Sequence, residues 1–404
     1  MFEIKGKYNT AKVFTDLIED SAVAQLKTLL DQEFMADSKV RIMPDVHTGK
    51  GCTIGTTMTI TDKVCPNLVG VDIGCGMTTV ALHDEEIDLE KLDKVIREHI
   101  PSGFNIRSEE LEFVDYELLN EELNELYYKD HVNINRAKLS VGTLGGGNHF
   151  IEVDKDDDGK LYLVIHSGSR HLGHEIATYY QELAEKQVAG NDRDSINKVI
   201  DTLRAEGRHR EIADELAKLK NKRIDIPKDL AYLTGDLFDK YIHDMELAQE
   251  YAYLNRRAMM HAILENADLH IDYAFDTIHN YIDVGNTTIL RKGAVSAKFY
   301  ETLLIPMNMR DGSLICKGKG NPDWNYSAPH GAGRLMSRAQ AKKQFSVEEF
   351  ADSMSGIYST SIGNDTLDEC PMAYKPMQSI IDNISNTVEI VNVIRPIYNF
   401  KAGS

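Results

Sequence analysis

Apolar residues recur along the chain with two different periods, and these predict alternating helical and strand-rich regions. Between residues 20 and 34 they follow helical spacing, which predicts one amphipathic helix near the start of the chain. From residue 40 to 82 the apolar runs are short, β-branched and punctuated by glycine, as is typical of strands. Residues 86–140 return to a charged pattern that predicts helices.

The second half of the chain repeats this alternation on a larger scale. The run LYLVIHSGSRHLG, residues 161–173, predicts a strand that ends in a polar, glycine-containing loop. Long helical patterns then occupy about 175–265, and strand signals resume near residue 277. No internal repeat or low-complexity linker marks a boundary, so we predict one α+β domain over residues 1–404 with a helical excursion in its middle.

Composition adds a size and a compartment to this picture. A chain of 404 residues with 42% hydrophobic residues can bury a large core. Its cysteines are odd in number and form no CxxC pair, which predicts reduced thiols. The N-terminal segment lacks the apolar stretch of a signal peptide, and no run approaches the roughly 18 apolar residues of a membrane helix. We therefore expect a cytoplasmic protein that does not enter a membrane.

The formal net charge of −19 argues against a general nucleic-acid coat, because Lys and Arg must neutralise phosphates in such proteins. It does not exclude an enzyme that acts on nucleic acid. Such an enzyme can combine a small basic site with bound cations, which supply charge that the sequence does not count.

One apolar segment carries two residues that a buried strand would not choose. In CPNLVGVDIGCGM, Asp72 precedes Cys75 by three positions. Histidines also lie at predicted strand and loop ends beside Gly, Asn, Asp or Ser; they are His47, His149, His166, His279 and His330. Together these O, S and N donors suit Mn, Fe, Co or Zn rather than Mg or Ca. The alternative is that Cys75 is a small buried apolar residue and Asp72 caps a turn.

Two further segments combine a histidine with small residues and an arginine. HGAGR, residues 330–334, offers a nucleophile or base, room for a ligand, and the phosphate-binding cation Arg334. In HSGSR, Arg170 follows His166 in the same way, although either arginine could form an ordinary surface salt bridge. The loop GTLGGGNHF, residues 142–150, could approach a phosphate or be a flexible turn, since it matches no established phosphate-loop pattern.

Taken together and in order, the motifs closely resemble those of the RtcB family of RNA-splicing ligases. They are PDVHTGKGCTIG, VGVDIGCGM, GGGNHFIE, HSGSR, NRRAM, HN, SAPHGAGRLMSR and AYK. The resemblance spans about residues 40–375. It implies mixed β-sheets around a central metal and nucleotide site. It also implies joining of RNA ends that bear a 3′-phosphate or 2′,3′-cyclic phosphate to 5′-hydroxyl ends, with GTP as co-substrate and a pair of Mn²⁺ ions.

The resemblance also implies a role for individual residues. The implied metal ligands are Asp72, Cys75, His149, His166 and His279. His330 matches the histidine that becomes guanylylated, and Asp45 the carboxylate that orients it. The implied guanine-nucleotide contacts are Asn148, His149, Phe150, Ile151, Glu152, His279, Asn280, Pro306, Met307, Asn308, Met309, Ser313, His330, Gly331, Ala332, Gly333 and Lys375. Glu152 can accept hydrogen bonds from the guanine N1–H and amino group. Arg170 and Arg334 are candidates for RNA phosphates.

One loop departs from the family pattern. Residues 306–309 read PMNM where many relatives carry Pro-Gly-Ser-Met, which removes a glycine and a serine from a loop expected to contact phosphate. We expect a monomer, with an archease-type activator as a possible partner implied by some relatives. The same residues are compatible with a metal-dependent phosphodiesterase or phosphatase acting on nucleic-acid ends, or with a GTP- and metal-binding protein without turnover.

Overall fold

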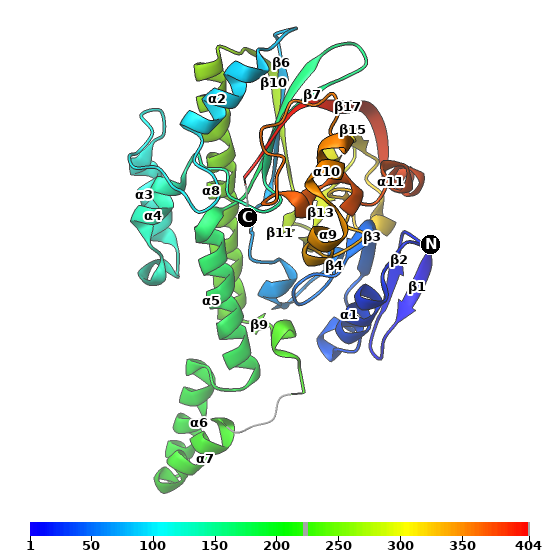
Figure 1. Ribbon diagram of the computed structural model, residues 1–404. Helices are drawn as coiled ribbons and strands as arrows, with labels where there is room; N and C mark the ends of the chain where they lie inside the picture. The colour runs from blue at the N-terminus through cyan, green and yellow to red at the C-terminus, as the bar shows by residue number, and fades with distance from the viewer. Residues whose placement is uncertain (221–224, 403–404) are drawn as a thin grey trace.

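The computed structural model describes residues 1–220 and 225–402 and contains two large β-sheets flanked by long helices (Figure 1). The first sheet has the strand order β1-β2-β3-β4-β12-β11 and is antiparallel except for the pair β2–β3. Its strands are β1 (Phe2–Lys5), β2 (Thr10–Val13), β3 (Val40–His47), β4 (Ile54–Thr59), β11 (Asn280–Asp283) and β12 (Ile289–Lys292).

The second sheet has seven antiparallel strands in the order β10-β6-β8-β7-β17-β15-β14. They are β6 (Gly76–Leu82), β7 (Phe150–Lys155), β8 (Leu161–Ser167), β10 (Ile271–Ile278), β14 (Thr302–Asn308), β15 (Gly312–Gly318) and β17 (Val388–Lys401). The first half of β17 pairs with β15 and its second half with β7. This one long strand therefore connects the β14–β15 hairpin to the other four strands of the sheet. Two short ribbons complete the strands: β13 (Ala294–Ser296) with β16 (Ser327–Pro329), and β5 (Lys63–Val64) with β9 (Leu233–Thr234).

The helices gather mainly on one flank of the second sheet, where α5 and α8 run alongside each other (Figure 1). The α-helices are α1 (Asp20–Leu30), α2 (Leu89–His99), α3 (Tyr116–Glu125), α4 (Ile134–Ser140), α5 (Arg170–Val188), α6 (Arg193–Ala205), α7 (Ile212–Lys220), α8 (Asp236–Ala267), α9 (Arg338–Gln344), α10 (Val347–Ser353) and α11 (Met377–Ile384). Short 3-10 helices include η2 (Pro66–Leu68), η7 (Leu367–Glu369) and η8 (Pro371–Ala373). No helix in the described ranges combines the length and the apolar character that crossing a bilayer requires.

The helical excursion falls where the sequence patterns predict it. Helices α5 to α8 occupy the region, and α6 and α7 project from the body as a pair (Figure 1). The predicted pattern over residues 194–222 forms two helices, α6 and α7, separated by a turn at Gly207 with φ +74° and by the 3-10 helix His209–Glu211; its last two residues lie outside the described part. Helix α8 begins after Gly235, which has φ +59°. It ends at Ala267, because the next residue, Asp268, adopts the left-handed conformation that terminates many helices.

One predicted strand is half wrong. Residues 68–82 read as one strand, but only β6, its second half, is extended. The first half is a 3-10 turn followed by bends, with Gly70 and Gly74 at φ +105° and +67°. Glycine populates positive φ at little cost, so the glycines that punctuate this apolar run turn the chain instead of extending it. The turn brings Asp72 and Cys75 to the beginning of β6.

The largest apolar cluster packs the first sheet with α1, α5 and α8, and two further clusters lie on the two sides of the second sheet. On its helical side, Ile96 of α2 and Ile263 of α8 pack with sheet residues such as Leu163. On the other side a smaller apolar cluster fills the space that β14, β15 and β17 enclose, with Val164 and Ile315 among its members. The strands of this sheet therefore carry buried side chains on both faces, which explains their near-continuous apolar runs.

Candidate active site

His330 is held by a buried carboxylate at the point where the two sheets approach each other. It follows β16, and its Nδ1 lies 2.6 Å from Oδ2 of Asp45 on β3. The same oxygen accepts the backbone N–H groups of His330 and Gly331 at 3.0 and 3.2 Å. Asp45 is fully buried, so these three donors compensate its charge. Because Nδ1 donates to the carboxylate, the lone pair of the neutral ring is on Nε2.

Five predicted ligand residues converge next to this histidine. Cys75, His149 and His166 have their Sγ and ring-nitrogen atoms within 4.8 Å of one another, and all three are buried. Cys75 Sγ lies 3.4 Å from His149 Nε2 and 3.2 Å from His166 Nε2. Asp72 joins this cluster because its Oδ2 lies 3.0 Å from His149 Nε2.

His279 lies between the cluster and the nucleophile candidate. Its ring centroid is 5.2 Å from that of His166 and 4.9 Å from that of His330. Its backbone N–H donates to the carbonyl of Cys75 at 2.9 Å, and the next residue, Asn280, donates to the carbonyl of Asp72 at 3.2 Å. The turn at residues 72–75 is therefore bound to the junction between β10 and β11, which carries His279.

Close backbone approaches make the cluster possible. A Cβ atom on Gly168 would lie 2.1 Å from Oδ1 of Asp72. A Cβ atom on Gly145 would lie 2.4 Å from Nδ1 of His149 and 2.2 Å from the guanidinium of Arg170, and Gly145 has φ +89°. Such distances exclude a side chain at either position. Gly168 of HSGSR and Gly145 of GTLGGGNHF thus make room for other side chains.

The protonation states of these side chains suit a cation. Burial lowers the pKa of His166 and of His279 well below the usual value, so both rings are neutral at neutral pH. Burial opposes the ionisation of Asp72, yet the neighbouring His149 lowers the pKa of Asp72 to about 2. Burial and the charge of Asp72 raise the pKa of the Cys75 thiol well above its usual value, so a thiolate here requires a nearby positive charge.

The donor set fits a transition-metal ion. A thiol, two or three imidazoles and one ionised carboxylate offer the mixture of soft, borderline and hard donors that Mn, Fe, Co and Zn accept. In the described part of the chain the Nδ1 atoms of His149 and His279 are buried without a hydrogen-bond partner. Burying an unpaired polar atom costs free energy, which a bound ion or ligand would offset. The individual ligand roles of the five residues stay predictions.

Helix α8 supplies two site residues that the sequence analysis did not single out. Asn255 Oδ1 accepts from the backbone N–H of Thr143 at 3.0 Å, and its Nδ2 donates to Thr143 and Gly168 carbonyls and to Ser167 Oγ, each at 3.1 Å. Arg256, fully buried, donates to the carbonyls of Gly74 and Ser167 at 2.9 and 3.1 Å. These two side chains join three loops of the site. The motif NRRAM, which places two polar residues inside a long helical pattern, could have identified them from the sequence.

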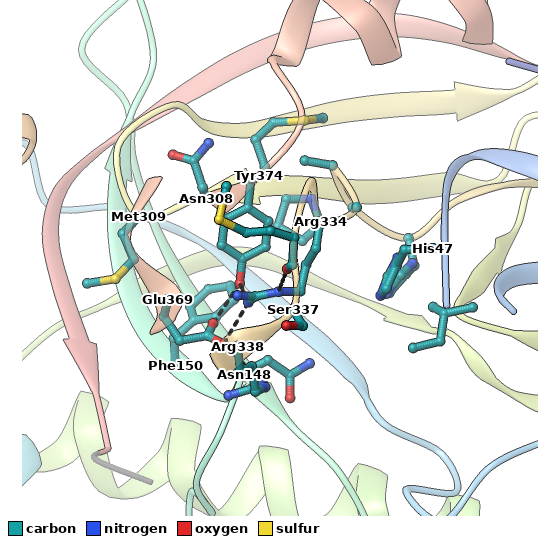
Figure 2. A pocket seen from close by; sticks show the side chains of 18 of the residues that line it. His47, Asn148, Phe150, Asn308, Met309, Arg334, Ser337, Arg338, Glu369 and Tyr374 are labelled. Carbon is teal, nitrogen blue, oxygen red and sulfur yellow. Dashed lines mark hydrogen bonds and ion pairs between the residues drawn. The ribbon is translucent and has the colours of Figure 1, made fainter. Parts of the chain in front are cut away.

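A cavity of about 830 Å³ opens beside His330 and is large enough for a nucleotide. Figure 2 shows Asn148 and Phe150, Asn308 and Met309, and His47 around it. Most of the predicted nucleotide contacts line it: Asn148, Phe150, Glu152, Pro306, Met307, Asn308, Met309, His330, Gly331, Ala332 and Gly333. Segments from β7, β14 and the loop after β16 therefore meet around one space.

Six of the predicted nucleotide contacts lie outside the cavity lining. His149 and His279 belong to the cluster described above, and Asn280 donates to Asp72 and accepts from Gly293. Ile151 and Ser313 are fully buried. Lys375 donates to the carbonyls of Leu17, Pro44 and Val46 at 3.0, 3.0 and 2.9 Å. The roles proposed for these residues at a nucleotide stay predictions.

The PMNM loop forms the end of the β14–β15 hairpin. Asn308 Oδ1 accepts from the backbone N–H groups of Arg310 and Asp311, both at 3.0 Å. Its Nδ2 donates to the carboxylate of Asp311 at 2.8 Å. The asparagine that replaces a small residue of the family pattern thus stabilises its own turn. These hydrogen bonds stabilise the turn of the hairpin, and residues 306–309 line the cavity.

Three positively charged side chains also line the cavity, and two of them, Arg338 and Lys401, were not predicted as site residues. Arg334, Arg338 and Lys401 surround Glu369 at 3.2, 2.9 and 2.7 Å, and Figure 2 shows the first two arginines bound in this network with Tyr374. Arg338 ends the motif HGAGRLMSR, so it could have been found from the sequence. Lys401 lies near the end of the chain in no motif, and only the pairing of β17 with β7 brings it here.

Arg170 lies behind the cluster, in a second cavity of about 370 Å³. It begins α5 with φ +56°, and its guanidinium donates to Thr143 Oγ1 at 2.9 Å and to the carbonyl of Gly103 at 2.8 Å. Arg136 lines the same cavity, and within the described part of the chain its buried Nε has no hydrogen-bond partner. Two guanidinium groups in one cavity favour an anion.

Comparisons with known proteins agree with this geometry. Residues 25–402 match the family model described as tRNA-splicing ligase RtcB. The chain is 31% identical over 402 residues to RNA-splicing ligase RtcB of Escherichia coli strain K12, which covers 89% of this chain and 88% of that protein. RNA-splicing ligase RtcB1 of E. coli strain ATCC 25922 is similar to the same extent. The tRNA-splicing ligase RtcB of Methanococcus maripaludis is 25% identical over 424 residues, covering 84% and 82% of the two chains.

Proposed function

Because this chain belongs to the RtcB family of RNA-splicing ligases, we propose that it joins RNA ends and uses GTP as co-substrate. One RNA end carries a 3′-phosphate or a 2′,3′-cyclic phosphate and the other a 5′-hydroxyl. The observation that carries the proposal is the 2.6 Å contact between Asp45 and Nδ1 of His330, at the wall of a nucleotide-sized cavity and beside the Cys75 cluster.

The first step is a nucleotidyl transfer to His330. The Nε2 lone pair attacks the α-phosphorus of GTP, the bond from that phosphorus to the bridging oxygen breaks, and pyrophosphate leaves. The ring becomes cationic as the P–N bond forms, and the buried carboxylate of Asp45 stabilises the charge through Nδ1–H. The product is a histidine–GMP phosphoramidate.

Two further transfers complete the reaction. An oxygen of the RNA 3′-phosphate attacks the same phosphorus and breaks the P–N bond, which gives an RNA end activated with GMP. The 5′-hydroxyl then attacks the RNA phosphate, a phosphodiester forms and GMP leaves. A cyclic phosphate end must first be opened by water. Each step conserves one phosphate bond of comparable energy until the last, so the energy of GTP is carried to the RNA.

The metal that we propose is Mn²⁺, and Asp72, Cys75, His149, His166 and His279 are the residues that would hold it. Bound there, it would polarise phosphoryl oxygens and lower the pKa of a bound hydroxyl group. The residues of the chain themselves position the nucleotide, and Glu152 accepts hydrogen bonds from the base. Arg334, the second predicted contact for RNA phosphate, lines the same cavity with its guanidinium bound to Glu369, Tyr374 and two backbone carbonyls.

For RNA we propose that phosphates bind in the cavity that Arg170 and Arg136 share. It adjoins the cluster, because a Cβ atom on Gly145 would meet both the guanidinium of Arg170 and Nδ1 of His149. Such a local positive site would allow a protein with a net charge of −19 to bind RNA phosphates. Binding should therefore depend on RNA ends and be weak for intact duplex.

The test is covalent labelling. Incubation with GTP labelled at the α-phosphate and Mn²⁺ should leave label on the full chain, stable to base and released by acid, as a phosphoramidate requires. His330→Ala should remove the label, and His209→Ala, which changes an exposed histidine far along the sequence, should retain it. No label with any divalent metal would contradict the proposal. RNA that is shortened or dephosphorylated without GTP would instead support a phosphodiesterase or phosphatase.

A further inference from the structure

Two buried carboxyl groups lie side by side beneath the cavity, and only one of them reaches it. Glu152 and Asp154 are two residues apart on β7, so their side chains point to the same face of the sheet. Glu152 is 3% exposed and lines the cavity, whereas Asp154 is 0% exposed and lies behind it. The proposed reaction gives Asp154 no role, yet burying a carboxyl group is costly.

The neighbours of Glu152 favour its charged form. Its Oε2 accepts a hydrogen bond from Nδ2 of Asn399 at 2.6 Å, across the β7–β17 pair. Burial is the largest influence and raises the pKa of Glu152, while Asn399, Asp154 and the ammonium of Lys401 oppose that rise. The charge of Lys401 is itself shared with Glu369, 2.7 Å away.

Asp154 has no such support. Apart from Glu152, no residue in the described part of the chain offers either of its oxygens a hydrogen bond. The paired position on β8 is Tyr162, whose hydroxyl donates to Asp156 instead, and the paired position on β17 is Pro396. Burial and the charge of Glu152 raise the pKa of Asp154 well above its usual value.

Two adjacent buried carboxyl groups cannot both be ionised. The negative charge belongs on Glu152, because Asn399 and Lys401 stabilise it there, and the proton belongs on Asp154. A neutral carboxylic acid is a hydrogen-bond donor, and the carboxylate of Glu152 is an acceptor beside it on the same face of β7.

We propose that Asp154 is a positioning residue for guanine recognition, which donates a hydrogen bond to Glu152 and keeps that carboxylate an acceptor for the base. The inference rests on the proposed function, since it takes Glu152 as the residue that contacts guanine. The N1–H and 2-amino groups of guanine are donors, whereas adenine presents an acceptor at N1. A charged Glu152 accepts both guanine donors; a protonated Glu152 would itself be a donor and would lose the preference.

The experiment compares Asp154→Val with Asp154→Asn in the full chain. Valine has a similar size but no donor, while asparagine keeps a donor and cannot ionise. Binding of GTP, ITP and ATP is measured by calorimetry across the neutral pH range. In the Val variant the loss of GTP affinity on acidification should begin about one pH unit higher, with roughly tenfold weaker binding at neutral pH. The discrimination of GTP against ATP should fall in parallel, and the Asn variant should keep the unsubstituted profile.

Infrared spectroscopy gives a readout that a purely structural role would not change. The unsubstituted chain should show the C=O stretching band of a protonated carboxyl group at neutral pH, and Asp154→Asn should lose that band. If the Val variant does not fold, the Asn variant and this band still decide the matter, since absence of the band would overturn the inference.

The outcomes separate this inference from the proposed function. If the unsubstituted chain binds GTP and the folded Val variant has an unchanged pH profile and purine preference, the role of Asp154 is wrong and the proposed function stands. If the unsubstituted chain binds no guanine nucleotide, both are wrong.

Discussion

At the scale of single residues, the thiol of Cys75 is the group whose environment demands most explanation. It is 1% exposed and lies next to the ionised Asp72, so that burial and charge both favour the neutral thiol. His166, whose Nε2 lies 3.2 Å from the sulfur, is uncharged because burial lowers the pKa of its ring well below the usual value. A divalent cation reverses this preference, because it stabilises thiolate and carboxylate together.

Cys75→Ser should therefore lower the metal content of the purified protein. Serine is a harder and far less acidic ligand than cysteine, so we expect metal affinity to fall on the order of tenfold or more. The measurement is bound manganese after dialysis against a fixed free concentration. Guanylylation should fall with it.

Cys52→Ser is the matched control for this change. Cys52 is also buried, but its sulfur lies near the hydroxyl groups of Thr53 and Thr56, which can bond to serine. Its metal content should equal that of the unsubstituted chain. Full metal occupancy in Cys75→Ser would show that the thiol is not a ligand.

At the scale of elements, the site depends on one helix that fixes several loops. Helix α8 carries Asn255 at a fully buried position, where both ends of its amide are used. The loop of residues 142–149 packs one core side chain, Leu144, and four of its residues are glycines, so hydrogen bonds between its backbone and a rigid helix help to determine where it lies. The ends of β6 and β8 are fixed in the same way by Arg256.

Asn255→Ala should destabilise the fold and the site together. It leaves one backbone N–H and two carbonyl groups buried without their partner, which should cost roughly 3 kcal/mol of unfolding free energy. The measurement is urea denaturation of the full chain, with guanylylation as the second readout. Asn266→Ala, at an exposed position of the same helix, should change neither by much. Equal stability of the two variants would contradict the role of Asn255.

At the scale of the whole molecule, one buried ion network joins segments that are distant in sequence. Glu369, in η7, contacts Arg334 and Arg338 near α9 and Lys401 at the end of β17. Burial opposes the charge of Glu369, but Lys401, Arg338 and Arg334 outweigh it and lower the pKa of Glu369 to about 2. The network thereby ties the C-terminal strand to the wall of the cavity.

This network predicts a pH dependence of stability. The ordinary pKa of Glu369 is 4.5, so the folded state binds fewer protons than the unfolded state below that pH. Its contribution is complete above pH 4.5 and is lost as the pH falls from 4.5 towards 2. Glu369→Gln should therefore lower the unfolding free energy by about 3 kcal/mol at neutral pH, and the difference should shrink in that window.

Denaturant titrations at neutral pH and at two acidic pH values would measure this change. Glu211→Gln removes an exposed ion pair with Arg208 and should leave stability unchanged at every pH. A difference between Glu369→Gln and the unsubstituted chain that stayed constant on acidification would show that the charge of Glu369 is not what stabilises the network.

The order of strands and helices could be largely predicted from periodicity, because local patterns report which faces are buried. The helix predicted at residues 20–34 forms as α1, which ends at Leu30 and is followed by a 3-10 turn at Glu33–Met35, and the described part of the excursion at 175–265 is mainly helical, as predicted. The run at residues 68–75 did not form the predicted strand, since an apolar run says that a segment is buried and not whether it is extended. Two glycines at positive φ made it a turn.

The sequence by itself determined the chemistry of the site: the types of donor atom, the histidine beside an arginine, and the motifs of the family. Only the tertiary structure decided which of these groups meet. Asp45 lies on β3 and His330 follows β16, while Lys401 and Asp154 belong to no motif, so their positions depend on strand pairing across nearly the whole chain. Local sequence patterns cannot predict such contacts, because the residues that meet are far apart in the sequence. Loop closure and packing of the whole fold bring them together.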